Sequence, residues 1–247
     1  MKSGYIPESY KCAKVIPFYK SGVTTEFTNY RPISLLSSFS KLLEKLVARQ
    51  MFKFINKYNI LYSHQYGFRP NHDTSQPLIQ FLEKIYEGMN KDNPEYTIAI
   101  FLDLNKAFDI VGFEILLKKL NPYGFRDNTK LWFRNYLTNR TQYISVRDFV
   151  SSCKEILCGV PQGSVLGLLL FLLYINDLPD CTLFFTSLFA DDTGFLKSFN
   201  NLETLFQNAN HELSKASYWF QAKKLTLNVL KTKYIVFRNK SMPFELC

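Results

Sequence analysis

The sequence predicts an α+β fold, within one continuous domain that has two lobes. Three observations support this prediction. Apolar, β-branched segments alternate irregularly with segments of helical periodicity, several strands are joined as hairpins, and no repeat or Ser/Gly linker interrupts the chain. A chain of 247 residues, 47% of them hydrophobic, is long enough to bury a substantial core.

The helices are predicted from apolar side chains that recur at helical spacing. One such stripe begins near Ser40. The apolar run from Val165 to Ile175 is too short to span a membrane, which needs about 20 residues, so we expect a buried core helix there. Asn200 is the expected N-cap of a later helix, with Glu203 in capping-box position. The predicted helices cover residues 40–57, 113–120, 128–137, 164–176 and 201–221.

The strands are predicted from short apolar and β-branched segments that turn residues delimit. The segment from Thr97 to Leu104 (TIAIFLDL) is almost wholly apolar, which is typical of a buried strand. A second apolar strand runs into the pair Asp191-Asp192, and we expect this pair to form the tip of a hairpin. The predicted strands cover residues 97–104, 140–146, 154–158, 182–190, 194–198 and 233–238.

The charge of the chain favours a polyanionic partner. Thirty Lys and Arg against 21 Asp and Glu give a net charge of +9, which suits nucleic acid, although a solvated basic surface explains the same excess. Five cysteines without a C-x-x-C pair and three scattered histidines give no zinc-site spacing. We therefore expect a reduced, intracellular protein, in the cytoplasm or the nucleus, with no signal peptide and no membrane partner.

Three carboxylates are the candidate chemical groups. Asp103 ends a buried strand, and Asp191 and Asp192 lie at the predicted hairpin tip. For the pair alone the alternative is ordinary turn chemistry, for which Asp is well suited. A third acid on a neighbouring strand favours a metal site over ordinary turn chemistry. Three such acids can hold two Mg²⁺ ions about 3.5–4 Å apart, the arrangement that stabilises the attacking and leaving oxygens in phosphoryl transfer.

Seven segments, taken together, make the sequence resemble the reverse transcriptase region of non-LTR (LINE-type, jockey-like) retrotransposons. Each segment alone is a weak signal, but the ordered set is very specific and covers nearly the whole chain. The segments are YRPISLLSSFSKLLEKL (30–46), HQYGFRPNHDT (64–74), FLDLNKAFD (101–109), GVPQGSVLG (159–167), FLLYINDLP (171–179), LFADDT (188–193) and LTLNVLKTKYIVF (225–237). The resemblance implies a polymerase of right-hand architecture that extends a DNA primer on an RNA template with dNTPs. Its antiparallel palm sheet is expected to carry residues 97–104 and the hairpin through Asp191-Asp192, and to be backed by the helices at 164–176 and 201–221.

The resemblance also implies roles for the carboxylates. Asp103, Asp191 and Asp192 match the family's aspartates that hold two Mg²⁺ ions, for which Mn²⁺ is a substitute, with the backbone carbonyl of Leu104 as an additional ligand. One ion lowers the pKa of the primer 3′-hydroxyl, and the other neutralises the leaving pyrophosphate. Phe108 matches the aromatic steric gate that excludes a 2′-hydroxyl, and its alternative is an ordinary core aromatic residue.

Further matches concern the incoming nucleotide. Gln162 matches a residue that lines the nucleotide pocket near the sugar, or is a turn residue in a Gly-rich loop. Lys20 and Arg31 match fingers cations that hold the triphosphate, although isolated cations are normally solvated surface. Lys231 matches a proton donor to pyrophosphate or a phosphate contact, and a solvated lysine is the alternative.

A last group is expected to contact nucleic acid. Arg69 is a fingers cation near template or nucleotide, and Gly163 lets the primer–template backbone approach closely. Asp109 we interpret as structural, bonded to nearby backbone. From Leu213 to Phe244 the chain holds seven basic residues and no acid. The members expected to bind nucleic acid without sequence preference are Lys223, Lys224 and Lys233.

The family pattern divides the chain into fingers and palm. Fingers are expected over residues 1–95, palm with the first catalytic Asp over 96–124, a fingers return helix and hairpin over 125–158, and palm again over 159–247. We expect a fragment that stops before the primer grip and the thumb, and that lacks the endonuclease of a full-length element.

Three positions depart from the family's usual residues. Phe113 replaces a histidine, Leu168 a proline and Tyr10 a tryptophan. These departures and the expected lack of a thumb favour the alternative function, an inactive or domesticated fragment that binds RNA without polymerising. The three intact aspartates favour the polymerase.

Overall fold

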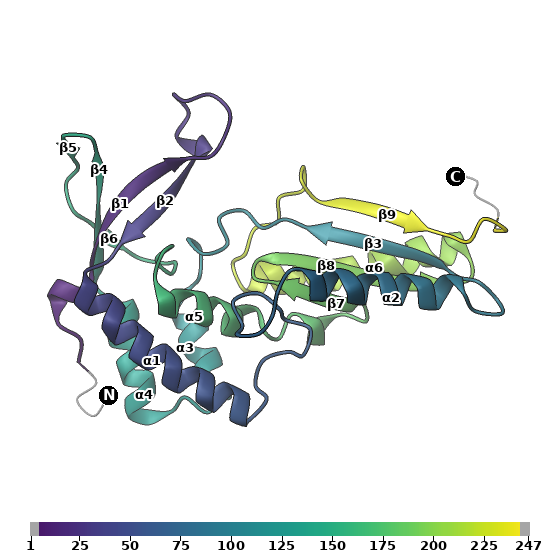
Figure 1. Cartoon of the computed structure of the whole chain (residues 1–247), viewed down its shortest axis with the longest axis horizontal. Helices are drawn as coiled ribbons and strands as arrows, with labels where there is room; N and C mark the ends of the chain where they lie inside the picture. Colours follow the sequence, from purple (N-terminus) through teal and green to yellow (C-terminus); the bar gives the residue numbers. More distant parts are fainter. Residues whose placement is uncertain (1–4, 243–247) are drawn as a thin grey trace. The chain divides into compact units, whose positions relative to one another are not determined.

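The chain forms two compact units, each built from two separate stretches of sequence. A computed structural model describes residues 5–242 (Figure 1). Unit 1 comprises Met1–Leu61 and Lys106–Tyr174, and unit 2 comprises Tyr62–Asn105 and Ile175–Cys247. The expected fingers and palm segments, with boundaries after residues 95, 124 and 158, describe a functional division and remain predictions.

Unit 1 contains a five-stranded sheet whose strands follow the order β2-β1-β4-β5, with β6 also paired to β4. β1 is antiparallel to β2 and parallel to β4. The strands are β1 (Cys12–Tyr19), β2 (Tyr30–Leu35), β4 (Arg140–Val146), β5 (Phe149–Val150) and β6 (Lys154–Ile156). The helices are α1 (Ser38–Lys57), α3 (Phe113–Leu120), α4 (Asp127–Leu137) and α5 (Val165–Ile175), with short 3₁₀ helices η1 (Glu8–Tyr10) and η2 (Phe27–Asn29).

Helix α5 lies in the apolar core of unit 1. Every side chain from Leu169 to Tyr174 is at most 1% exposed, as expected for a helix that is apolar on all sides. The buried Glu44 carboxylate lies at the N-terminus of this helix, where a negative charge is favoured, and accepts the Val165 N–H at 2.8 Å. It also accepts the Tyr136 hydroxyl at 2.7 Å, and burial, followed by the Glu44 charge, raises the pKa of Tyr136.

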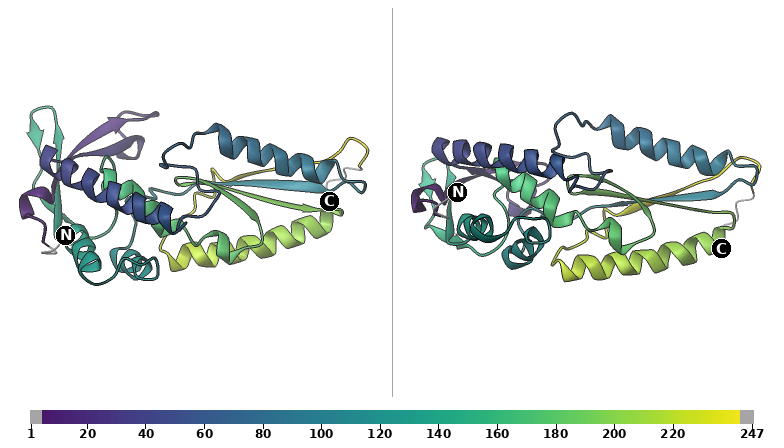
Figure 2. Two further views of the ribbon diagram at one scale, coloured as in Figure 1. Left: turned by 60° about the horizontal axis from the view of Figure 1, so that its bottom comes forward. Right: turned by 90° about the horizontal axis from the view of Figure 1, so that it is seen from below.

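Unit 2 contains a four-stranded antiparallel sheet in the order β7-β8-β3-β9. Helix α2 covers one face of this sheet and helix α6 covers the other (Figure 2). Under α2, Phe81 and Ile85 pack against Ala99 and Leu196 of the sheet. The elements are α2 (Ser75–Met89), β3 (Tyr96–Leu102), η3 (Pro179–Cys181), β7 (Phe185–Phe189), β8 (Asp192–Phe199), α6 (Leu202–Ala222) and β9 (Lys233–Phe237).

The mixed α+β class is confirmed, and every predicted helix and strand corresponds to an observed element. Strands β1, β2 and β5 and helix α2 were not predicted. Of the helices expected to back the antiparallel sheet, α6 does so, but the second one is α2, and α5 belongs to unit 1 up to Tyr174. The N-cap of α6 is Asn201, whose Oδ1 accepts the Thr204 N–H at 3.0 Å, so the predicted cap at Asn200 was wrong by one residue.

The apolar run of α5 is a buried core helix, as predicted. Within residues 5–242, no helix has both the length and the apolar character needed to cross a membrane.

Candidate active site

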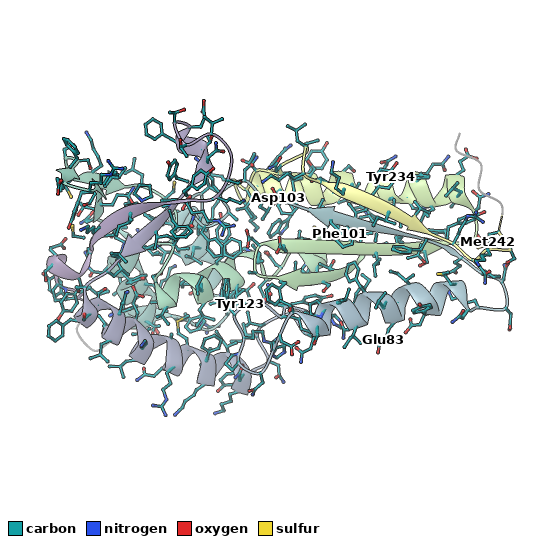
Figure 3. All side chains as sticks on the ribbon, turned by 45° about the horizontal axis from the view of Figure 1, so that its top comes forward. Glu83, Phe101, Asp103, Tyr123, Tyr234 and Met242 are labelled. Atoms are coloured by element: carbon teal, nitrogen blue, oxygen red, sulfur yellow. The ribbon has the colours of Figure 1, made fainter. Side chains whose placement is uncertain are left out.

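Two of the three candidate carboxylates face each other across neighbouring strands of unit 2. The antiparallel ladder between β3 and β8 ends with the pair Leu102↔Thr193. The next position in this register places Asp103 directly opposite Asp192, and both side chains therefore leave the sheet on the same face. Figure 3 shows Asp103 at the end of β3, beyond Phe101. Antiparallel pairing thus brings together two acids that lie far apart in the sequence.

The third carboxylate lies in the turn that joins β7 to β8. Phe189 pairs with Asp192, so the two loop residues are Ala190 and Asp191, and Asp192 is already the first residue of β8. The prediction that both acids form the tip was therefore wrong by one position. Ala190 has a φ of 57°, the sign that short hairpin loops often need at their first position and that a side chain disfavours.

Electrostatic repulsion acts between the two facing carboxylates at this end of the sheet. Burial, followed by the nearby charge of Asp103, raises the pKa of Asp192. Lys231 partly offsets the negative charge, because its Nζ lies 3.7 Å from Oδ2 of Asp103. Both partners are solvent-accessible, so this ion pair adds little to stability and is free to rearrange.

The three candidate carboxylates are not arranged as a metal site in this structure. Among residues 5–242, no group of three or more histidine, cysteine, aspartate or glutamate side chains is arranged to hold a metal ion. The donor chemistry nevertheless fits Mg²⁺, which prefers carboxylate and carbonyl oxygens, and a cation would relieve the repulsion between Asp103 and Asp192. Leu104 bridges to Leu227, with flanking hydrogen bonds made by the Asp103 carbonyl and the Asn105 N–H.

Phe108 and Gln162, both expected near the nucleotide, lie in unit 1. The ring of Phe108 packs against Phe171 of α5 with centroids 4.4 Å apart, and the residue remains half-buried. The Gln162 amide donates from Nε2 to Oδ1 of Asp109 at 2.9 Å. The Asp109 carboxylate is thus bonded to a side chain and not, as predicted, to nearby backbone. Burial raises the pKa of Asp109, while this hydrogen bond opposes the rise.

Gly163 has an explanation within the protein itself. Its φ is +108°, and a Cβ there would lie 2.7 Å from the carbonyl oxygen of Ser34. The backbone of β2 therefore makes the close approach that the sequence analysis assigned to nucleic acid, and the Ser34 N–H also donates to the Gln162 carbonyl at 2.7 Å.

Lys20 and Arg31 share one face of the β1–β2 hairpin. Arg31 pairs with Phe18, and Lys20 follows Phe18 by two positions, so strand alternation places both cations on the same side. Both residues are exposed, and the Lys20 N–H donates to the Asn29 carbonyl at 2.9 Å. This arrangement is compatible with binding of one polyphosphate, and equally with a solvated hairpin.

The remaining predicted cations lie in unit 2 and differ in their surroundings. Arg69 donates from Nη1 to the carbonyls of Tyr62 and Gln65, at 3.2 and 2.9 Å, so it stabilises a protein loop. Lys223 lies 3.4 Å from Oδ2 of Asp177 and over the Trp219 ring. The two other predicted cations are both exposed, Lys224 just after α6 and Lys233 at the start of β9.

Two residues that support the acidic turn, Gln65 and Gly67, were not predicted from the sequence. The buried Gln65 carboxamide accepts the Ala190 N–H at 3.2 Å, and Gly67 packs directly against the Ala190 backbone. Both belong to the HQYG segment, but nothing in that segment indicates which of its residues faces the turn.

Comparison with known proteins identifies the family. Residues 19–244 match the model of the reverse transcriptase (RNA-dependent DNA polymerase) family. The chain therefore belongs to the reverse transcriptases, a family of RNA-directed DNA polymerases.

Its relatives are the polymerases of non-LTR retrotransposons. The chain is 31% identical to the RNA-directed DNA polymerase from mobile element jockey of Drosophila melanogaster, over 96% of this chain and 27% of the relative. It is 33% identical to the probable polymerase from transposon BS, over 98% of this chain and 28% of that relative, and 36% identical to that of the X-element, over 76% and 21%, both from the same organism. The chain thus spans about a quarter of the length of the curated relatives it matches.

Solved structures share the fold. The telomerase of Candida tropicalis, in complex with a fragment of telomeric RNA, superposes with a TM-score of 0.68 over 94% of this chain and 42% of that chain, at 12% sequence identity. The Candida albicans telomerase gives a TM-score of 0.64 at 13% identity, over 97% of this chain and 44% of that chain.

Proposed function

We propose that unit 2 carries the catalytic centre of an RNA-directed DNA polymerase, with Asp103, Asp191 and Asp192 as its metal ligands. The observation that carries this proposal is the strand register, which places Asp103 opposite Asp192 and next to the turn that bears Asp191. In an apo chain these acids repel, and repulsion between acids at a strand end is tolerated where a cation normally intervenes.

Reverse transcriptases use divalent metal ions, and Mg²⁺ is the ion we propose here. Bound Mg²⁺ would supply Lewis-acid activation of a primer hydroxyl and charge neutralisation at a leaving pyrophosphate. The chain's own contribution is to present the three carboxylates on the end of a rigid sheet, with the Leu104 carbonyl beside them. Lys231 balances the charge of Asp103 and has the reach and chemistry of a phosphate contact.

We assign the remaining roles by the family resemblance, supported by local geometry. The β1–β2 hairpin belongs to the fingers, and its same-face cations Lys20 and Arg31 hold the triphosphate. Phe108 is the steric gate, because its half-buried ring is held by Phe171 and so can resist displacement by a 2′-hydroxyl. Gln162 lines the sugar pocket, with its amide oriented by Asp109.

The proposed partners are an RNA template, a DNA primer and dNTPs. The net charge of +9 and the exposed Lys224 and Lys233 support binding to a phosphate backbone. The complex of the Candida tropicalis telomerase with telomeric RNA shows that a related fold binds RNA in that protein. The four-stranded sheet of unit 2 is the proposed palm.

The decisive experiment is primer extension on poly(rA)·oligo(dT) with Mg²⁺, run beside an RNA-binding measurement by fluorescence anisotropy. The assay uses the 247-residue chain. We expect Mg²⁺-dependent extension that Asp103→Asn and Asp192→Asn abolish while their thermal melts stay close to wild type. RNA binding without extension would favour the alternative, an RNA-binding fragment that does not polymerise. Extension by either variant at the wild-type rate would refute the assignment of the metal ligands.

A further inference from the structure

The segment from His64 to Gly67 forms an additional bridge at the outer edge of the unit 2 sheet. The Leu188 N–H donates to the His64 carbonyl at 2.9 Å, and the Tyr66 N–H donates to the Leu188 carbonyl at 2.8 Å. Gln65 therefore pairs with Leu188 in a parallel bridge, two residues before the acidic turn begins at Ala190. This bridge brings the segment beside the hairpin that carries Asp191 and Asp192.

The Gln65 side chain reaches from this bridge to the turn itself. It is 1% exposed, and its Oε1 accepts two backbone donors, the Gly67 N–H at 2.9 Å and the Ala190 N–H at 3.2 Å. Ala190 is buried and has a positive φ. A buried N–H without an acceptor is strongly unfavourable, so the carboxamide oxygen stabilises a turn that its own sequence disfavours.

The amide orientation shows which half of the Gln65 side chain matters. Its Nε2 is buried and, among the described residues, has no hydrogen-bond partner. Because both neighbouring groups are N–H donors, only the oxygen can face them, and the orientation is fixed by the network. The unsatisfied Nε2 donor therefore has an explanation: Gln65 is buried here because its Oε1 atom is needed as the acceptor of the two backbone N–H groups.

Gly67 provides the second contact with the turn. A Cβ at this position would lie 2.1 Å from the Ala190 nitrogen, 2.8 Å from its Cα and 2.8 Å from the Phe189 carbonyl carbon. All three are backbone atoms, which cannot move away as a flexible side chain can. The turn therefore lies directly on the Gly67 backbone, and no other residue type fits there without displacing it.

We propose that Gln65 is a positioning residue for the acidic turn, which it holds through the Ala190 N–H. The close contact with Gly67 sets the distance between the turn backbone and the 64–67 segment. Asp191 and Asp192 follow Ala190 directly, so a shift of its backbone moves both carboxylates relative to Asp103. This role rests on the proposed metal site, but its effect on the turn is independent of any metal.

The test compares Gln65→Met, which keeps the volume and removes the acceptor, with Gln65→Glu, which keeps an acceptor. Gln207→Met, on the exposed face of α6, is the matched control. Hydrogen exchange of the Ala190 amide is measured by NMR in the metal-free chain. We expect exchange at least about tenfold faster in Gln65→Met, at or near the wild-type rate in Gln65→Glu, and unchanged in the control. Wild-type protection of Ala190 in Gln65→Met would overturn the proposal.

A second measurement follows Mn²⁺ binding by the loss of the free-ion EPR signal. We expect about tenfold weaker binding in Gln65→Met and in Gly67→Ala, with thermal melts to show that the fold is retained. Asp192→Asn separates the two hypotheses. If Asp192→Asn binds Mn²⁺ as tightly as wild type, the metal site is wrong and the proposed function fails. If it loses binding while both Gln65→Met and Gly67→Ala retain it, the positioning role alone fails.

Discussion

Replacement of Asp192 by asparagine tests the repulsion between the two facing carboxylates. Asn has nearly the same size as Asp, so the change removes charge and little packing. Asp192 keeps contact with solvent at the start of β8, opposite Asp103, although neighbouring atoms partly desolvate its carboxylate. In the metal-free chain we therefore expect Asp192→Asn to stabilise the fold rather than to weaken it.

The expected magnitude follows from the distance across the strands. Directly opposite side chains in an antiparallel pair have Cβ atoms about 5 Å apart. Two unit charges at that distance repel by about 3 kcal/mol at an effective dielectric constant near 20, and by about 0.8 kcal/mol in water. Because Asp192 is exposed and Lys231 offsets Asp103, we expect a gain of about 0.5–1 kcal/mol at low salt. For a chain of this size, that is about 1–4 °C in Tm.

The pH dependence of this gain has a definite sign. The pKa of Asp192 is raised in the folded state, so the native chain holds its proton at pH values where the unfolded chain has lost it. The stability of the wild type therefore falls as the pH rises through this window. The Asp192→Asn variant does not lose stability in this way. Its gain in stability over the wild type is therefore absent below about pH 4 and reaches its full value near neutrality.

The assay is a series of thermal melts from about pH 3, roughly one unit below the ordinary pKa of an aspartate, up to about pH 8. Asp92→Asn, in an exposed loop of the same unit, is the control for loss of a negative charge elsewhere. Added Mg²⁺ is expected to raise the Tm of the wild type and to leave Asp192→Asn almost unchanged. A variant that is less stable than wild type at pH 7, or an advantage that is constant with pH, would refute the reasoning.

Three further predictions follow from the described contacts. Glu44→Gln weakens the acceptor of the Val165 N–H and the Tyr136 hydroxyl in a buried position, so it should lower the free energy of unfolding by about 1–3 kcal/mol in denaturant melts. Phe108→Val should raise incorporation of rNTP relative to dNTP by about tenfold or more in primer extension, while an unchanged ratio would leave the ring a core residue. RNA affinity should fall steeply between about 50 and 200 mM salt, and Lys224→Gln should reduce that slope more than Lys223→Gln, because Asp177 already neutralises Lys223.

The sequence predicts the elements whose pattern is simple. The apolar segment of β3 and the uninterrupted apolar run of α5 both signal burial, and the structure buries both. Strand β1 was missed because lysine and proline interrupt its alternation. Helix α2 was missed because Leu78 and Ile79, both exposed, add apolar residues on its outer face and obscure the helical stripe.

The candidate site was predictable in identity but not in geometry. The family segments single out Asp103, Asp191 and Asp192, but only the register shows that Asp192 is a strand residue opposite Asp103 while Asp191 lies in the turn. The role of Gln65 was not predictable, because a buried amide and an exposed one look alike in a sequence. Its function depends on a contact with a residue 125 positions away.

The interleaving of the two units constrains how the chain acquires its structure during synthesis. Each unit consists of an early and a late stretch, so a nascent chain that has reached residue 105 holds the first half of both units and the complete form of neither. Strand β3 must wait for β8 and β9, with partners such as Phe199 and Phe237 more than a hundred residues downstream. Such long-range pairing slows folding and leaves apolar strands exposed to chaperones and to aggregation in the meantime. Neither unit can therefore be isolated by trimming an end of the chain, and a single-unit protein would need its two stretches joined by a new connection.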